Sequence, residues 1–237
     1  MGSLLEECIS AAGPAWTRYE NHPWFQALEQ GLLPIERFVH FQLDDAPFIP
    51  YLHQTVALAL AKAPVGSKWS HTAAKMLSQV FVANELATKK EILEALGVRN
   101  PRFDRWALSP RREAYANHLV RVALEGTTAE TAAALLPCTF FTRLVGRRFE
   151  SVEIPGPEAY RRWARIYADK QMYQMLEAHE QMMEDEVARE PSRREHLVRL
   201  FVRSTQHQVA VFDDALNPGQ SWPTVALSDF QPQLTDL

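Results

Sequence analysis

The sequence predicts an all-α protein, a single-domain bundle of seven to eight helices. Apolar residues recur at three- and four-residue spacing through almost every segment, as they do on the buried face of a helix. Strand signals are nearly absent, because the 237 residues include only 9 glycines, no Asn-Gly or Asp-Gly hairpin and no recurring alternation of period two. The breaks between helices are short turns, so we expect one helical domain over residues 1–216 and a C-terminal tail over residues 217–237.

The first half of the chain is expected to form four helices, each ended by a local signal. Pro23 suits the first turn of a short helix that stops before Gly31. Pro47 and Pro50 each remove a backbone hydrogen bond, so the long helix that contains them must bend or break there. Gly97 closes the fourth helix. These helices are expected over residues 3–17, 23–30, 35–62 and 71–96.

The second half is expected to form four more helices after a linker at residues 98–108. Ser109 is a good N-cap, with proline following at the first helical position. Two capping boxes, Thr127 with Glu130 and Ser192 with Glu195, mark two further helix starts. The four helices are expected over residues 110–124, 128–146, 158–189 and 192–216.

The most apolar of these helices contains Pro137 and, directly after it, Cys138. A proline inside a helix cannot donate to the carbonyl of Ala133, and its ring crowds that turn, at a cost of roughly 3 kcal/mol. An unpaired cysteine is often only a small buried hydrophobe. A kinked, buried helix with one thiol is therefore either a packing feature or a site.

Composition limits the class of protein. The net charge is −4 with both signs interspersed, which argues against a nucleic-acid partner or an anionic membrane surface. No apolar run reaches the roughly 20 residues of a membrane span, and no signal peptide is recognisable. Cys8 and Cys138 are too few for a disulfide scaffold and match no zinc spacing. We therefore expect a cytoplasmic protein with a small-molecule substrate.

Metal and cofactor motifs are absent from the sequence. A di-iron bundle needs Glu-x-x-His pairs, but Glu85 is followed at that offset by Thr88. The acidic run at residues 177–186, which includes His179, is expected to be a solvated helix face. No phosphate loop or nucleophile elbow is present. We expect no metal and no cofactor.

Several short motifs remain, and their order and spacing matter more than any one of them. They are His22-Pro23-Trp24-Phe25, Asp44-Asp45 with Phe48, Glu85 with Leu96-Gly97-Val98, Tyr115 with His118-Leu119, Ala134-Leu-Leu-Pro137-Cys138, and Tyr160 with Trp163 and Tyr167. Together they resemble the thiaminase II (TenA) family, whose members share a heme-oxygenase-like helical fold. The resemblance runs from Trp16 to Leu216.

The resemblance implies a thiolate that attacks an aminopyrimidine ring. Cys138 would be the nucleophile, and Asp45 would hold the ring nitrogen and the exocyclic amine. Phe48 and Tyr115 would pack on or beside the ring, and Tyr167 would assist by hydrogen bonding. A flat heteroaromatic ring suits aromatic walls and one orienting carboxylate. The resemblance also implies a homo-oligomer, a tetramer or a dimer.

The last helix departs from the family pattern. Gln208 stands where the family has a glutamate, and Val211 where it has an aromatic residue. Glutamine cannot transfer a proton, so that role would pass to Asp44 or Glu85. The resemblance therefore assigns Cys138, Asp45 and Gln208 to catalysis, and Asp44, Phe48, Glu85, Tyr115, Tyr167 and Val211 to substrate binding.

Three functions stay open on the sequence. The first is an aminopyrimidine hydrolase acting on thiamin or its degradation products. The second is a relative that uses the same pocket for a different small molecule. The third is a binding protein that has kept the pocket without the chemistry.

Overall fold

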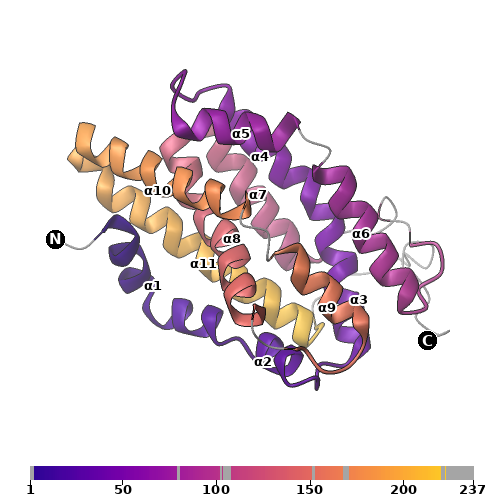
Figure 1. Ribbon diagram of the computed structural model, residues 1–237. Coiled ribbons are helices and arrows are strands. Elements are labelled where there is room, and N and C mark those ends of the chain that lie inside the picture. Colours follow the sequence, from indigo (N-terminus) through magenta and orange to yellow (C-terminus); the bar gives the residue numbers. More distant parts are fainter. Residues whose placement is uncertain are drawn as a thin grey trace.

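The computed structural model describes residues 3–78, 81–101, 103, 108–150, 153–167, 171–219 and 222. These residues confirm the all-α prediction, since they form helices and no strand. There are eleven α-helices among them, more than the expected seven or eight, because three of the expected helices are divided. The α-helices, shown in Figure 1, are α1 (Leu4–Glu20), α2 (Pro23–Glu29), α3 (Ile35–Asp45), α4 (Ile49–Leu60), α5 (Lys68–Ser78), α6 (Phe81–Ala95), α7 (Pro110–Glu125), α8 (Thr128–Phe149), α9 (Glu158–Ile166), α10 (Gln171–Arg189) and α11 (Arg194–Leu216).

Helix α8 lies at the centre of the bundle, in contact with α10 and α11 and also with α4, α7 and α9 (Figure 1). The capping box expected at its start is confirmed: the Thr127 hydroxyl accepts from the Glu130 N–H at 3.2 Å, and the Glu130 carboxylate accepts from the Thr127 N–H at 2.9 Å. Every residue from Thr128 to Pro137 is buried. The helix continues through Pro137, whose carbonyl accepts a hydrogen bond from the Tyr19 hydroxyl at 3.0 Å.

The expected end of this helix at Gly146 is wrong, because α8 continues to Phe149. A Cβ at Gly146 would lie 2.8 Å from the carbonyl oxygen of Tyr167. Glycine therefore serves here to let another backbone segment approach closely. That segment is the turn at Tyr167, where α9 ends, so the single helix expected over residues 158–189 is divided into α9 and α10.

Replacing Gly146 by alanine is expected to destabilise the protein by about 1–3 kcal/mol, since the added methyl group has no room beside Tyr167. The same change in an unhindered helix would stabilise it by about 1 kcal/mol. Urea denaturation followed by circular dichroism measures the difference. A neutral or stabilising result would contradict the close contact.

The expected break near Pro47 and Pro50 is confirmed. A short 3₁₀ turn, η1 (Ala46–Phe48), joins α3 to α4, and the Ile49 N–H donates to the Ala46 carbonyl. The helix expected over residues 71–96 is instead α5 and α6, with residues 79 and 80 outside the described residues.

Two further local expectations need correction. The capping box at Ser192 does not form, because residues Pro191–Arg193 make a 3₁₀ turn, η3, and the Ser192 hydroxyl donates to Glu190 at 3.1 Å. Helix α1 extends past the expected Thr17 and changes direction at Gly13, whose φ is 47°. Only Pro14, directly after Gly13, hints at that kink in the sequence.

An aromatic cluster joins the helices next to α8. Trp24 packs edge-on against Trp163 with ring centroids 5.4 Å apart, and Phe212 lies 4.6 Å from Phe25 and 5.3 Å from Phe41. These rings are buried and packed against one another, so they hold the helices around the candidate site in fixed positions.

The expected tail lies outside the described residues from 220 onward, except for Trp222. Its indole N–H donates to the carbonyl of Leu108 at 2.9 Å. Within the described part of the chain, no helix is both long enough and apolar enough to cross a membrane.

Candidate active site

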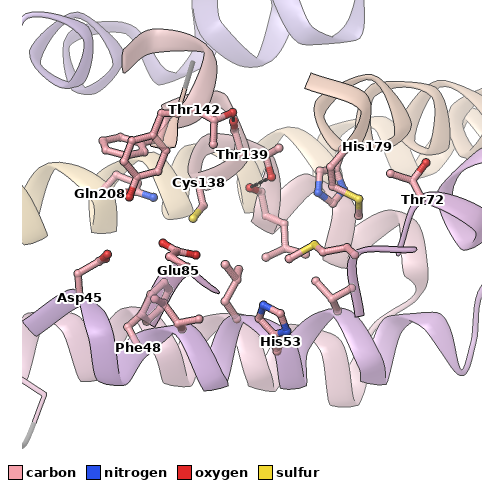
Figure 2. Close-up of a pocket in the computed structure, with 18 of the residues that line it drawn as sticks. Asp45, Phe48, His53, Thr72, Glu85, Cys138, Thr139, Thr142, His179 and Gln208 are labelled. Carbon is pink, nitrogen blue, oxygen red and sulfur yellow. Dashed lines mark hydrogen bonds between the residues drawn. The ribbon is translucent and has the colours of Figure 1, made fainter. Parts of the chain in front are cut away.

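A cavity of about 150 Å³ opens among the helices, with side chains from α3, η1, α4 to α8, α10 and α11 around it. Six of the nine residues assigned from sequence line it: Asp45, Phe48, Glu85, Cys138, Tyr167 and Gln208. Figure 2 shows Cys138, Glu85 and Gln208 around one space, with Asp45 and Phe48 beside it. Asp44, Tyr115 and Val211 are buried behind this lining.

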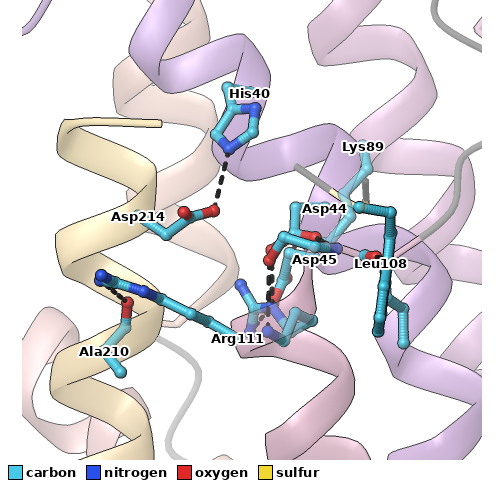
Figure 3. A network of polar contacts seen from close by, with 11 residues as sticks. His40, Asp44, Asp45, Lys89, Leu108, Arg111, Ala210 and Asp214 are labelled. Atoms are coloured by element: carbon cyan, nitrogen blue, oxygen red, sulfur yellow. Dashed lines mark hydrogen bonds and ion pairs between the residues drawn. The ribbon is translucent and has the colours of Figure 1, made fainter. Parts of the chain in front are cut away.

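The adjacent carboxylates Asp44 and Asp45 do different things. Asp44 accepts from the Ser109 N–H at 2.7 Å and from Arg112 Nε at 3.1 Å, so it holds the start of α7 against α3 (Figure 3). Asp45 lines the cavity and forms ion pairs with Lys89 Nζ at 2.8 Å and with Arg112 Nη1 at 3.1 Å. Only the second carboxylate is therefore placed to contact a ligand.

Lys89 and Arg112 were not found from the sequence. Lys89 is fully buried and donates to Gln42 Oε1 at 3.1 Å as well as to Asp45. Two signals were available. Lys89 follows Glu85 by one helical turn, a spacing that allows an ion pair. Arg112 lies in the first turn of α7, where a positive charge is unfavourable next to the helix dipole, so its presence there indicates nearby carboxylates.

Arg112 is packed between aromatic rings. Its guanidinium lies 5.1 Å from the Phe48 ring centroid and 5.6 Å from that of Phe41. Burial alone would raise the pKa of Asp45, but the charges of Lys89 and Arg112 hold that pKa below its ordinary value. Asp45 is therefore a carboxylate at neutral pH. One nitrogen of Arg112, Nη2, is buried and has no hydrogen-bond partner among the described residues.

The Cys138 thiol is held protonated in the protein without substrate. Burial, with smaller contributions from Asp45 and Glu85, raises its pKa to about 12, although Arg112 and a hydrogen bond from Tyr115 oppose the rise. A reaction through the thiolate must therefore remove the proton with a base inside the cavity.

Glu85 is the carboxyl group with the right proton affinity for that step. Burial, partly opposed by Lys89 and assisted by Asp45, raises its pKa to about 6. A group that titrates near the working pH both accepts and returns a proton readily. Figure 2 shows its carboxyl group next to Cys138 in the cavity.

Replacing Glu85 by glutamine is expected to change how stability depends on pH. A pKa of about 6 in the folded protein, against 4.5 in the unfolded chain, means that the wild-type protein loses stability as pH rises through that interval. The variant lacks this loss, so its melting temperature relative to wild type should increase from pH 4.5 to pH 7. Thermal melts at three pH values measure this. A constant difference would contradict the raised pKa.

Contacts among the lining residues and the residues behind them hold the cavity wall in place. Gln208 Nε2 donates to the Tyr115 hydroxyl at 3.3 Å, and the Tyr115 ring stacks on Phe48 with centroids 5.5 Å apart. Tyr167 meets Phe141 edge-on at 5.0 Å. Val211 is 1% exposed and packs in the core, so in this structure it forms no wall of the cavity.

His179 overturns the expectation that residues 177–186 are a solvated face. Glu177 is exposed, but His179 is 1% exposed and lines the cavity. The run is therefore amphipathic, with Glu177 and Asp185 exposed on the outer side of α10 and this imidazole and Glu186 buried. Among the described residues, no three potential metal ligands lie together in a group that could hold a metal ion.

Known proteins resemble this chain over most of its length. It is 31% identical over 174 residues to the aminopyrimidine aminohydrolase of Bacillus subtilis strain 168, covering 73% of this chain and 72% of that protein. It is 24% identical over 219 residues to the aminopyrimidine aminohydrolase of Halalkalibacterium halodurans, covering 91% of this chain and 96% of that protein.

Solved structures share the fold. A TenA family transcription regulator from Silicibacter sp. TM1040 superposes with a TM-score of 0.79 at 22% identity, covering 92% of this chain and 98% of that one. A protein from Sulfolobus solfataricus that is provisionally described as a TenA-like thiaminase superposes with a TM-score of 0.77 at 22% identity, covering 94% of this chain and 100% of that one. Residues 9–217 match the TENA/THI-4/PQQC family as a whole, and the chain belongs to that family.

Proposed function

We propose that this protein is an aminopyrimidine hydrolase that uses Cys138 as its nucleophile. The observation that supports it most is the meeting of a thiol, a carboxyl group of raised pKa and a carboxylate in one cavity with an aromatic wall. Two relatives named aminopyrimidine aminohydrolase add to the case.

In the proposed reaction the pyrimidine lies against Phe48 with its polar edge toward Asp45. Glu85 removes the proton from Cys138, and the thiolate adds to an electron-poor ring carbon. The displaced electron pair expels the amine from the adjacent methylene, and the amine leaves with a proton as ammonia. Water adds to the methylene, the electrons return, and the thiolate is released and reprotonated. One water is consumed and one ammonia is formed.

Glu85 takes the proton-transfer role in this scheme because Gln208 has no titrating group. The Gln208 amide instead positions the Tyr115 hydroxyl, which hydrogen-bonds the thiol. General acid–base catalysis commonly raises the rate by about 10² to 10⁴, so we expect a side chain that transfers the proton to lie in the cavity.

The test is hydrolysis of 4-amino-5-aminomethyl-2-methylpyrimidine and of thiamin by the purified full-length protein. Release of the hydroxymethyl product, with ammonia in the first case, is the expected result. Heat-denatured protein serves as the control for uncatalysed hydrolysis. Absence of product from both compounds would contradict the proposal.

A second candidate is a protein of this family that binds or transforms a different small molecule. Both oxygens of Asp45 are already ion-paired, with Lys89 and Arg112, which leaves that carboxylate less free to accept from an amine. Arg112 Nη2, which has no partner among the described residues, would donate a hydrogen bond to a ligand that presents an acceptor in place of an amine. Calorimetry that detects pyrimidine binding without turnover would favour this candidate.

A further inference from the structure

The cavity is longer than one pyrimidine ring requires. Its lining residues along η1 and α4 run from Phe48 to Val56, and eight residues of helix span about 12 Å. A single substituted ring placed beside Cys138 fills only part of this length. The remainder needs another part of the ligand or water.

The end away from Asp45 has its own polar groups. Figure 2 shows His53, Thr72 and His179 there, and we call this place the far end. Leu52 and Met175 add apolar surface to the lining, and Thr139 and Thr142 lie near Cys138 (Figure 2). The cavity therefore has polar groups at both ends.

His179 is a fixed hydrogen-bond donor. The indole N–H of Trp69 donates to its Nδ1 at 3.0 Å, so the imidazole proton lies on Nε2. Burial lowers the pKa of His179 to about 3, which keeps the ring neutral. Both side chains are 1% exposed, so this orientation is held by packing. Thr72 already donates to the Lys68 carbonyl at 2.9 Å, and His179 is the far-end group whose donor is fixed by its own hydrogen bond with Trp69.

We propose that the substrate is an aminomethylpyrimidine whose amine carries an extended substituent ending in an oxygen acceptor that His179 binds. The inference rests on the proposed function and names its substrate class. For an N-acyl substrate the bond broken is that between the methylene and the nitrogen. The acyl group then leaves as a primary amide in place of ammonia, and water supplies the hydroxyl of the product.

Two ligands of equal length test this. They are the N-pentanoyl and N-(4-oxopentanoyl) derivatives of 4-amino-5-aminomethyl-2-methylpyrimidine, which differ by one methylene replaced with a carbonyl. Calorimetry with Cys138→Ser protein measures binding without turnover. We expect the oxo ligand to bind about fivefold more tightly, the usual gain from one hydrogen bond.

Variants at His179 identify the donor. His179→Phe should abolish the preference for the oxo ligand, while His179→Gln, which offers both an acceptor for Trp69 and an N–H donor, should restore part of it. His71→Gln is the matched control, because this exposed histidine lies on α5 outside the cavity, and it should leave the preference unchanged. If His179→Phe does not fold, the ligand pair still decides, since equal affinities would overturn the inference.

The outcomes separate the two proposals. Preference for the oxo ligand without turnover by wild-type protein would support the far-end site and contradict the proposed hydrolysis. Turnover of the unsubstituted pyrimidine with no preference between the two ligands would overturn the far-end site alone. Failure of all these pyrimidines to bind would overturn both.

Discussion

Replacing Cys138 by serine is expected to lower turnover of the aminopyrimidine by at least about 10³-fold. A serine hydroxyl is far less acidic than a thiol, and Glu85, with a pKa of about 6, cannot ionise it to a useful extent. The side chains are nearly the same size, so the cavity and its ligand affinity should be kept. Initial rates of product formation, with calorimetry on the same samples, measure both effects.

Cys8→Ser provides the matched control. Cys8 is the other free cysteine, buried in α1 and outside the cavity. The substitution buries a hydroxyl in an apolar place and should cost about 1–3 kcal/mol of stability while leaving turnover unchanged. If Cys138→Ser remained active, or if Cys8→Ser lost activity while folded, the assignment of the nucleophile would be wrong.

Replacing Arg112 by leucine is expected to lower the free energy of unfolding by about 3–5 kcal/mol. Arg112 is 3% exposed and pairs with both Asp44 and Asp45, so its loss leaves Asp44 buried without its cation and Asp45 with Lys89 alone. Urea denaturation at pH 7 measures the effect.

Arg111→Leu is the control on the neighbouring residue. Arg111 donates to the carbonyl of Ala210 at 3.1 Å from a partly exposed position, so its loss should cost about 1 kcal/mol or less. Adding Asp44→Asn to Arg112→Leu removes the unpaired charge and should recover part of the stability. Equal costs for the two arginines would show that the buried network does not hold α7 to α3.

Most of the fold could be predicted because its signals are local. Each signal lies within a few residues of the helix end or helix face that it determines. Examples are the helical spacing of apolar residues, the proline at the start of α7 and the capping box at Thr127. The division between α9 and α10 could not be predicted in this way. It depends on the turn at Tyr167 packing over Gly146, which is 21 residues earlier in the chain and makes a tertiary contact.

The candidate site divides similarly. Cys138, Asp45 and Glu85 came from a resemblance of motifs and do line one cavity, although their roles stay predictions. Lys89 and Arg112 were missed because their partners are far along the chain: Lys89 is 44 residues from Asp45. A buried lysine cannot be told from a surface lysine by its neighbours in sequence, since only the fold brings its carboxylate to it.

The shared arginine between Asp44 and Asp45 has a consequence for how such a protein can acquire new substrates. The proposed ring recognition at Asp45 and the anchoring of α7 depend on the same guanidinium, so most substitutions at Asp45 should be lost from a mutant library as unfolded protein. His53 lines the other end of the cavity and is partly exposed, so it should accept many residues. In directed evolution for altered specificity, accepted substitutions should therefore accumulate around His53, and Asp45 should be retained.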